Sequence, residues 1–146
     1  MNKDDIQNDL TSAYGSGSDG SAPRGDQWAS ILNRDPNRPV TLINFFKFRE
    51  IAGYGDKTGS TPGNVAFDQY AAVSIPTMER VGGKFLLVAP FEASLIGENE
   101  EWDLVAIGSY PNQKAFLDLY QDAAYRGAFE HRTAACARQK VLIVDG

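Results

Sequence analysis

Hydrophobic and polar positions divide the body of the chain into strands and helices. Residues 40–48 (VTLINFFKF) are rich in β-branched and aromatic side chains and are apolar at both odd and even positions, which predicts a strand covered on both faces. Residues 84–89 (KFLLVA), 102–110 (WDLVAIGSY) and 140–145 (KVLIVD) have a similar composition. The pattern therefore predicts four strands, and Pro90 with the turn signals after it predicts that the second and third strands form a hairpin.

Helical periodicity appears in three stretches between these strands. Apolar side chains recur at helical spacing over residues 64–81, where Pro76 is expected to kink the helix and Gly82 to end it. Residues 112–121 and 125–137 each carry an apolar stripe as well. The predicted order is β, α, β, β, α, β, with the last two helical stretches sharing the second helical position.

This order is the ferredoxin-like α+β arrangement, in which an antiparallel sheet carries its helices on one face and leaves the other face uncovered. The uncovered face is predicted to be apolar, because Ile43 and Phe45 alternate with Leu42 and Phe46 along the first strand. A large apolar sheet face is expected to avoid water. We therefore predict a homodimer in which the sheet of a second subunit covers this face, giving a dimeric α/β barrel.

The beginning of the chain has a different composition from the rest. Residues 11–26 (TSAYGSGSDGSAPRGD) are dominated by Gly, Ser, Asp and Pro, which bury too little apolar surface to offset the entropy lost on ordering. We predict a flexible, disordered tail over residues 1–25 and a single folded domain over residues 26–146. Trp28 is expected to be the first large side chain that docks on the domain.

Charge and composition restrict the classes of partner. The chain has 146 residues, a net charge of −5 and no cluster of Lys and Arg, so a nucleic-acid partner is not expected. No stretch reaches the ~20 apolar residues that span a bilayer, and no apolar leader follows Met1, so we expect a cytoplasmic protein without a membrane partner. Cys136 is the single cysteine, which excludes an intramolecular disulfide and indicates a small buried apolar side chain.

The usual sequence motifs of cofactor and metal chemistry are missing. The chain has no GxGxxG, GxxxxGK[ST], HExxH or GxSxG motif, and it has one histidine and one cysteine. We therefore expect neither a cofactor nor a metal site built from His and Cys.

Several short motifs resemble those of a known family in their order and spacing. They are the NFFKFR run of residues 44–49, Tyr54, a Gly-rich loop, Tyr70, Gly82-Gly83, Trp102-Asp103, Tyr110-Pro111, and Tyr125 followed seven residues later by Arg132 in His131-Arg132-Thr133. Over about residues 38–146 the sequence resembles the DUF1330 proteins of the dimeric α/β-barrel superfamily. The resemblance implies a ferredoxin-like protomer whose sheet packs on that of its twin. It implies no particular activity, because the superfamily includes cofactor-independent monooxygenases, haem-degrading enzymes, muconolactone-isomerase-like proteins and plain ligand binders.

His131 is the first candidate for chemistry. It is the only histidine, and histidine is the residue type that suits acid–base catalysis near neutral pH. A lone histidine is more often structural, however. His131 lies about 100° around the predicted helix from Arg132, so it can also face solvent.

Arg132 is the second candidate, because it lies on the otherwise apolar stripe of the last predicted helix. A buried guanidinium there requires either a carboxylate partner or an anionic ligand. Asp103 or Glu92 can be that partner, and Asp103 can instead orient His131. Trp102, beside Asp103, is expected in core or dimer packing or in the lining of a ligand pocket.

Polar side chains of the first strand and three tyrosines complete the candidates. Asn44 interrupts an apolar strand face, so it either stabilises the fold through hydrogen bonds or contacts a ligand. Lys47 and Arg49 lie on the opposite face beside the predicted 52–64 loop, where they either hold a substrate carboxylate or are merely solvated. Three aromatic side chains with polar tips can line a pocket or belong to the core: Tyr54, Tyr70 and Tyr125.

Three functions remain open on these observations. The first is a cofactor-free enzyme for a small molecule, with His131, Arg132 and Asp103 as catalytic residues and the 52–64 loop as a lid. Its pocket is expected between the sheet and the helices or near the dimer seam. The second is a dimeric module that binds a small organic ligand, anionic if Arg132 holds it, without turnover. The third is a purely structural dimer.

Overall fold

Residues 2–55 and 59–146 are described by the computed structural model, and within them the chain forms five helices and four strands. In chain order these are α1 (Lys3–Tyr14), α2 (Gly25–Leu32), β1 (Val40–Phe48), α3 (Gly63–Arg80), β2 (Lys84–Pro90), β3 (Leu104–Tyr110), α4 (Gln113–Tyr120), α5 (Ala123–Ala135) and β4 (Cys136–Asp145). From β1 onward the order is the βαββαβ order predicted from the sequence, with α4 and α5 in the second helical position.

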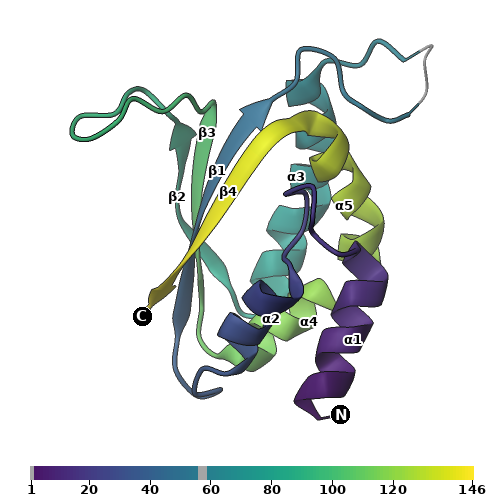
Figure 1. Cartoon of the computed structure of the whole chain (residues 1–146), viewed down its shortest axis with the longest axis vertical. Coiled ribbons are helices and arrows are strands. Elements are labelled where there is room, and N and C mark those ends of the chain that lie inside the picture. Colours follow the sequence, from purple (N-terminus) through teal and green to yellow (C-terminus); the bar gives the residue numbers. More distant parts are fainter. Residues whose placement is uncertain (1, 56–58) are drawn as a thin grey trace.

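The four strands form one sheet in the order β2-β3-β1-β4, and each paired strand runs antiparallel to its neighbour. β1 is a central strand, with Leu42 opposite Gly108 of β3 and opposite Ile143 of β4. The helices lie on one side of this sheet (Figure 1). The predicted α+β class, an antiparallel sheet with helices on one face, is therefore confirmed.

The two faces of the sheet differ in their surroundings. Val40, Leu42 and Phe46 of β1 point towards the helices and are buried. The other face carries the side chains that alternate with them, and no helix of the described residues covers it (Figure 1). We call this the outer face and define it by its apolar members: Ile43, Phe45, Leu87, Val105, Ile107, Leu142 and Val144.

Two predicted strands begin at other residues than expected. β4 starts at Cys136, directly after α5, whereas the sequence predicts a helix to residue 137 and a strand from residue 140. The polar side chains of Arg138 and Gln139 interrupt the apolar pattern here, as is common in an edge strand such as β4. β3 starts at Leu104, after the Trp102-Asp103 pair that was predicted to open it.

The segment before the sheet differs from the flexible tail predicted for residues 1–25. α1 is capped by Asn2, whose side chain accepts a hydrogen bond from the Asp5 backbone N–H at 2.8 Å. Leu10 of α1 is fully buried, and the Tyr14 hydroxyl donates to the Tyr120 carbonyl oxygen of α4 at 2.7 Å. The Gly- and Ser-rich composition of the loop after α1 obscured this helix, which docks through a few apolar residues.

α2 brings Trp28 into the same aromatic cluster. The Trp28 ring centroid lies 5.9 Å from that of Tyr14 and 5.6 Å from that of Tyr120, and the Trp28 side chain is buried as the sequence predicts. The N-terminal helices thus extend the core beyond the sheet and the helices α3, α4 and α5 that cover it.

The structure bears on two further expectations, the 52–64 loop and the absence of a membrane-spanning stretch. Residues 56–58 of the predicted 52–64 loop lie outside the described residues, and α3 begins at Gly63. In the described ranges, the helices fall short of the length and apolar character that crossing a membrane requires.

Candidate functional site

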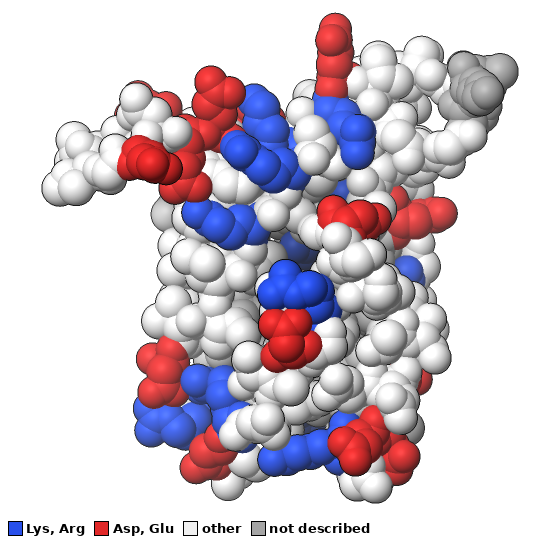
Figure 2. All heavy atoms as spheres, in the orientation of Figure 1, with Lys and Arg blue, Asp and Glu red and all other residues white. Residues whose placement is uncertain are grey.

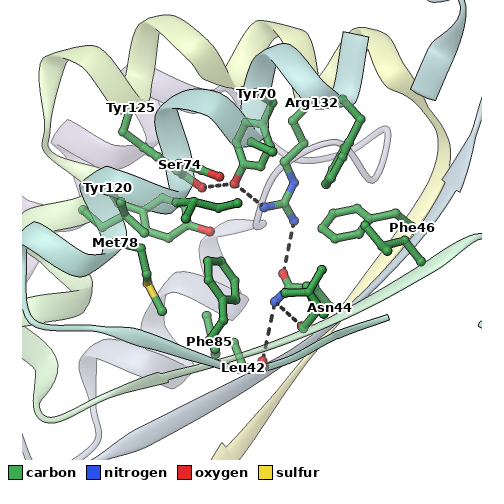
Figure 3. A pocket seen from close by; sticks show the side chains of 18 of the residues that line it. Leu42, Asn44, Phe46, Tyr70, Ser74, Met78, Phe85, Tyr120, Tyr125 and Arg132 are labelled. Carbon is green, nitrogen blue, oxygen red and sulfur yellow. Dashed lines mark hydrogen bonds between the residues drawn. The ribbon is translucent and has the colours of Figure 1, made fainter. Parts of the chain in front are cut away.

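A cavity of about 70 Å³ lies between the helix-covered face of the sheet and helices α3 and α5. We call it the inner cavity. Its walls are mostly apolar, with Leu42, Phe46, Met78 and Phe85 among them (Figure 3). Seven of its lining residues carry polar side-chain groups: Asn44, Tyr70, Ser74, Tyr110, Tyr120, Tyr125 and Arg132.

Arg132 is the one charged residue in this lining, and it comes from α5. Its side chain is only 4% exposed. The guanidinium carbon lies 4.8 Å from the ring centroid of Phe46 and 5.2 Å from that of Phe129, so aromatic faces contact the cation on two sides. A full positive charge is therefore held inside the core rather than at its rim.

The hydrogen bonds of Arg132 go to neutral groups. Its Nε donates to Gln139 Oε1 at 2.8 Å, one terminal nitrogen donates to the Tyr70 hydroxyl at 3.1 Å, and the other donates to Asn44 Oδ1 at 3.4 Å (Figure 3 shows the last two). No Asp or Glu within residues 2–55 and 59–146 forms an ion pair with it. Since a guanidinium has five N–H groups, these contacts leave one on each terminal nitrogen for a further acceptor.

The pKa of Arg132 is held above its ordinary value. Burial alone acts to lower it, and the nearby phenol groups of Tyr70, Tyr120 and Tyr125 act in the opposite direction. The side chain is consequently charged at neutral pH.

Two tyrosines extend the polar cluster from α3 to α5. The hydroxyl oxygens of Tyr70 and Tyr125 lie 2.6 Å apart and share a hydrogen bond. Burial raises the pKa of Tyr125 well above its ordinary value, so this group stays a neutral phenol. One of the two phenol hydrogens is used in this bond. The other can be directed to a group in the cavity.

Asn44 lies at the sheet end of this cluster. Its amide nitrogen donates to the Ala106 carbonyl oxygen at 3.0 Å, which turns its amide oxygen towards Arg132 (Figure 3). Asn44 therefore joins the sheet to the buried cation, and both roles considered for it from the sequence are compatible with this position.

His131 lies apart from the inner cavity although it adjoins Arg132 in sequence. Its Nδ1 shares a hydrogen bond with the Tyr54 hydroxyl at 2.7 Å, in an exposed contact between α5 and the loop after β1. Neither residue lines the inner cavity. The one-residue step along the helix directs the two side chains to different surroundings.

Asp103, the third predicted catalytic residue, contacts the end of β1. Its Oδ2 accepts a hydrogen bond from the Phe48 backbone N–H at 2.7 Å, and its Oδ1 lies 3.5 Å from Lys47 Nζ. Trp102 beside it is buried and donates its indole N–H to Glu100. These contacts hold the start of the β3 segment against β1 and do not reach Arg132 or His131.

Arg49 also remains outside the cavity. Its backbone N–H donates to the Ala135 carbonyl oxygen at 2.8 Å, and the residue is exposed. Of the ten residues singled out in the sequence, four line the inner cavity: Asn44, Tyr70, Tyr125 and Arg132.

Sequence reasoning missed four polar members of this site, one of which is Tyr110 at the end of the third predicted strand. Ser74 follows Tyr70 by four residues on α3, a spacing that places both on one helix face. Tyr120 belongs to the apolar stripe of α4 and reads as core. Gln139 gave no signal, because its position was not assigned to a strand.

Comparison with known proteins identifies the family. The family model described as "Domain of unknown function (DUF1330)" matches residues 61–146. The chain belongs to the DUF1330 family. This confirms the resemblance inferred from the sequence motifs, and a search of curated proteins gives no match.

Two crystal structures resemble this DUF1330 protein closely. One is of RPA0582 from Rhodopseudomonas palustris, and the other is of methylated RPA0582. The first, described as a protein of unknown function, has 34% sequence identity and a TM-score of 0.77 over 85% of this chain and 94% of its own. The methylated protein has 34% identity and a TM-score of 0.78 over 85% and 92% of the two chains. The fold is thus shared, and neither description assigns a ligand.

The surface charges of this DUF1330 protein contrast with Arg132. On the face seen in Figure 2, Lys and Arg side chains lie beside Asp and Glu side chains rather than in one continuous basic area. Arg34, Arg38 and Arg80, for example, each pair with an aspartate within 2.8 Å. The buried guanidinium differs from them in having neutral partners.

Cys136 and the acidic residues add no further reactive centre to the described part of the chain. Cys136 is buried, and burial raises the pKa of its thiol to about 11, so it is a protonated, unreactive group as the sequence indicates. Among the described residues, His, Cys, Asp and Glu side chains form no group of three that could hold a metal ion.

Proposed function

We propose that this DUF1330 protein binds a small organic anion, most simply a carboxylate, at Arg132 in the inner cavity. The observation that carries the proposal is a guanidinium that is 4% exposed, borders a cavity and has only neutral hydrogen-bond partners among the described residues. A carboxylate accepts two parallel N–H bonds from such a group.

The energetics of burial support this proposal. Transferring a cation from water into a protein core costs several kcal/mol, and hydrogen bonds to neutral groups recover only part of it. An arginine kept for packing alone is readily replaced by an apolar residue of similar length. A bound anion supplies the missing charge, and it explains why Tyr70, Asn44 and Gln139 hold the guanidinium in one orientation.

The size of the cavity limits the ligand group that it receives. About 70 Å³ is roughly half of the ~150 Å³ cavity that holds benzene in another protein. The inner cavity therefore suits a carboxylate with a few attached atoms. Its phenol hydroxyls and apolar walls favour a ligand with one charged end over an inorganic anion, which would bring a larger hydration cost.

A cofactor-free enzyme is the second candidate, and the hydrogen-bonded Tyr70–Tyr125 pair favours it. A phenol beside a bound carboxylate can donate its proton to one atom of the substrate and take a proton back from another atom of the same substrate, as an isomerisation requires, while the second phenol orients it. His131 and Asp103 have no part in this version. Recovery of the ligand unchanged after long incubation would leave binding as the function.

We further propose that the protein is a homodimer paired through the outer face. The face carries seven apolar side chains from all four strands, and Leu87, Leu142 and Val144 on it are each at least 42% exposed in the single chain. Covering such a face with an identical face removes apolar surface from water on both subunits. The inner cavity lies on the opposite side of the sheet, so each subunit keeps its own complete site.

The test of anion binding compares Arg132 with its neighbour. Isothermal titration calorimetry with acetate and propanoate is expected to detect binding to the unaltered protein. Arg132→Met removes the charge at nearly constant length and should weaken binding at least about tenfold, because charged hydrogen bonds are lost. His131→Ala is the matched control and should bind as the unaltered protein does.

Folding is checked in the same samples by thermal unfolding. We expect Arg132→Met to melt at the same temperature as the unaltered protein or above it, since it removes a buried charge. Unchanged acetate binding by a folded Arg132→Met protein, or no binding by the unaltered protein, would reject the proposed function.

A further inference from the structure

A second, larger hollow also borders Arg132. It has a volume of about 480 Å³ and runs between the segment of residues 17–31 and β4. We call it the N-terminal groove. Trp28 and Ile31 line one side of it, and Val141 and Ile143 of β4 line the other.

The groove and the inner cavity meet at the same side chains. Leu42, Tyr120 and Arg132 line both hollows. Arg132 is therefore accessible from both hollows, and a molecule held at Arg132 can extend into the groove. Clefts that hold small organic molecules have volumes of roughly 300–1,000 Å³, a range that includes the groove but not the inner cavity.

The charges along the groove favour an anion. Its charged lining residues are Arg24, Arg132 and Lys140, and none of the described residues that line it is acidic. Arg24 pairs with Asp26 and Lys140 pairs with Glu100, so the two cations at the rim are already compensated. Only the deepest one, Arg132, has no carboxylate near it among the described residues.

Trp28 adds an independent observation. Its side chain is 1% exposed, and its indole N–H has no hydrogen-bond partner in the described part of the chain. Such an orphaned buried donor is rare and costly, because water no longer satisfies it. Trp102, the other tryptophan, donates its indole N–H to Glu100 at 3.2 Å. Because this N–H is already shielded from water, an aliphatic chain packed beside the Trp28 ring takes no hydrogen bond away from it.

We propose that the N-terminal groove binds the body of an amphipathic monocarboxylate whose carboxylate is held by Arg132. The aliphatic body lies between Trp28 and Ile31 on one side and Val141 and Ile143 on the other. The proposal rests on the proposed function for the carboxylate and extends it to the ligand class. It also makes α2 and the loop before it a wall of the site rather than an appendage.

Chain length is the first test. Isothermal titration calorimetry is performed with acetate, butanoate and octanoate on the whole protein. Each methylene that leaves water should strengthen binding by about fourfold, so octanoate is expected to bind at least about 100-fold more tightly than acetate. Equal affinity of acetate and octanoate, within about threefold, would overturn the groove while leaving the Arg132 site intact.

A matched pair of variants assigns the effect to the groove. Val141→Phe fills the groove from β4 and should weaken octanoate binding at least about tenfold with little effect on acetate. Val65→Phe on α3 is the control, because Val65 is similarly exposed, 42% against 38%, and lines neither hollow. Thermal unfolding confirms that both variants fold. An equal loss of octanoate binding in the two variants would reject the assignment.

Tryptophan emission reports where octanoate binds rather than how tightly it binds. In a Trp102→Phe protein the emission comes from Trp28 alone, and octanoate should shift or quench it. In a Trp28→Phe protein the emission comes from Trp102, near the outer face, and should not respond. A response of Trp102 alone would place octanoate on the outer face and overturn the proposal. No acetate or octanoate binding at all would reject it together with the proposed function.

Discussion

At the residue scale, Arg132 serves two opposing demands. Its burial disfavours folding, because a charge leaves water without an opposite charge to meet it. The same burial makes it an effective binding group, because a low-dielectric, water-poor setting strengthens its attraction for an anion. The aromatic rings of Phe46, Phe129 and Tyr70 around the guanidinium lower the cost of burying the charge. They do not supply the negative charge that an anion would bring.

Asp103 was also predicted as a catalytic residue, but its contact with the Phe48 backbone N–H is structural. Asp103→Ala leaves the Phe48 N–H without its acceptor and should lower the free energy of unfolding by about 1–2 kcal/mol. Asp103→Asn retains an acceptor oxygen and should cost less. Urea unfolding followed by circular dichroism measures both. Loss of acetate binding at unchanged stability would instead assign Asp103 to the ligand site.

The sequence identified the members of the site better than their grouping. Arg132 on an apolar stripe and Asn44 on an apolar strand were recognisable because each breaks a hydrophobic pattern. Which of them meet depends on packing between α5 and β1, which the sequence of either element does not contain. His131 was proposed because histidine suits acid–base chemistry, and its position about 100° around the helix from Arg132 already allowed a side chain that faces solvent.

At the element scale, α1 shows how little apolar surface a docked helix needs. Ile6, Leu10 and Tyr14 recur at a spacing of four, and this stripe was the signal for the helix in the sequence. It was outweighed by the polar residues around it and by the glycines that follow. Elements with long apolar runs, such as β1 and α3, were predicted within a residue or two because pattern and burial agree there.

The Asp9–Arg126 ion pair should make the docking of α1 depend on pH. Arg126 donates to Asp9 at 2.7 Å and holds the pKa of this carboxyl below its ordinary value of 3.8. A depressed folded-state pKa gives stability that is present above the unfolded-state pKa and is lost as the pH falls through the folded-state pKa. Asp9→Asn should therefore destabilise the protein at pH 7 and down to about pH 4.

The expected difference is about 0.2–1 kcal/mol, since the pair is partly solvated. It should shrink on further acidification, when Asp9 is protonated in the unaltered protein too. Thermal unfolding of both proteins between pH 3 and pH 7 measures it. A difference that grows towards pH 3 would contradict this role of the ion pair.

At the scale of the whole molecule, the sheet separates two surfaces with different tasks. Its helix-covered face holds the inner cavity and borders the N-terminal groove, while the outer face is open (Figure 1). A substitution on one face should thus leave the other unaffected. The predicted homodimer can be tested without disturbing the ligand site for this reason.

Ile107→Lys places a charge in the middle of the outer face. If two such faces pair, the buried charge should weaken the dimer roughly 100-fold or more. Sedimentation velocity over a range of concentrations measures the change, with Val65→Lys on exposed α3 as control. Acetate binding per chain should stay the same. An unaltered protein that sediments as a monomer at every concentration would contradict the dimer.

The single buried thiol allows the opening of the α5–β4 junction to be measured by chemical labelling. Cys136 is where α5 turns into β4, two elements that bring Arg132 and Gln139 together. A thiol reagent can attack it only while that junction is transiently open, so the labelling rate reports how often the junction opens. No other cysteine competes for the reagent. The labelling rate of Cys136 therefore measures, in solution and on the unaltered chain, how rigid this part of the ligand site is.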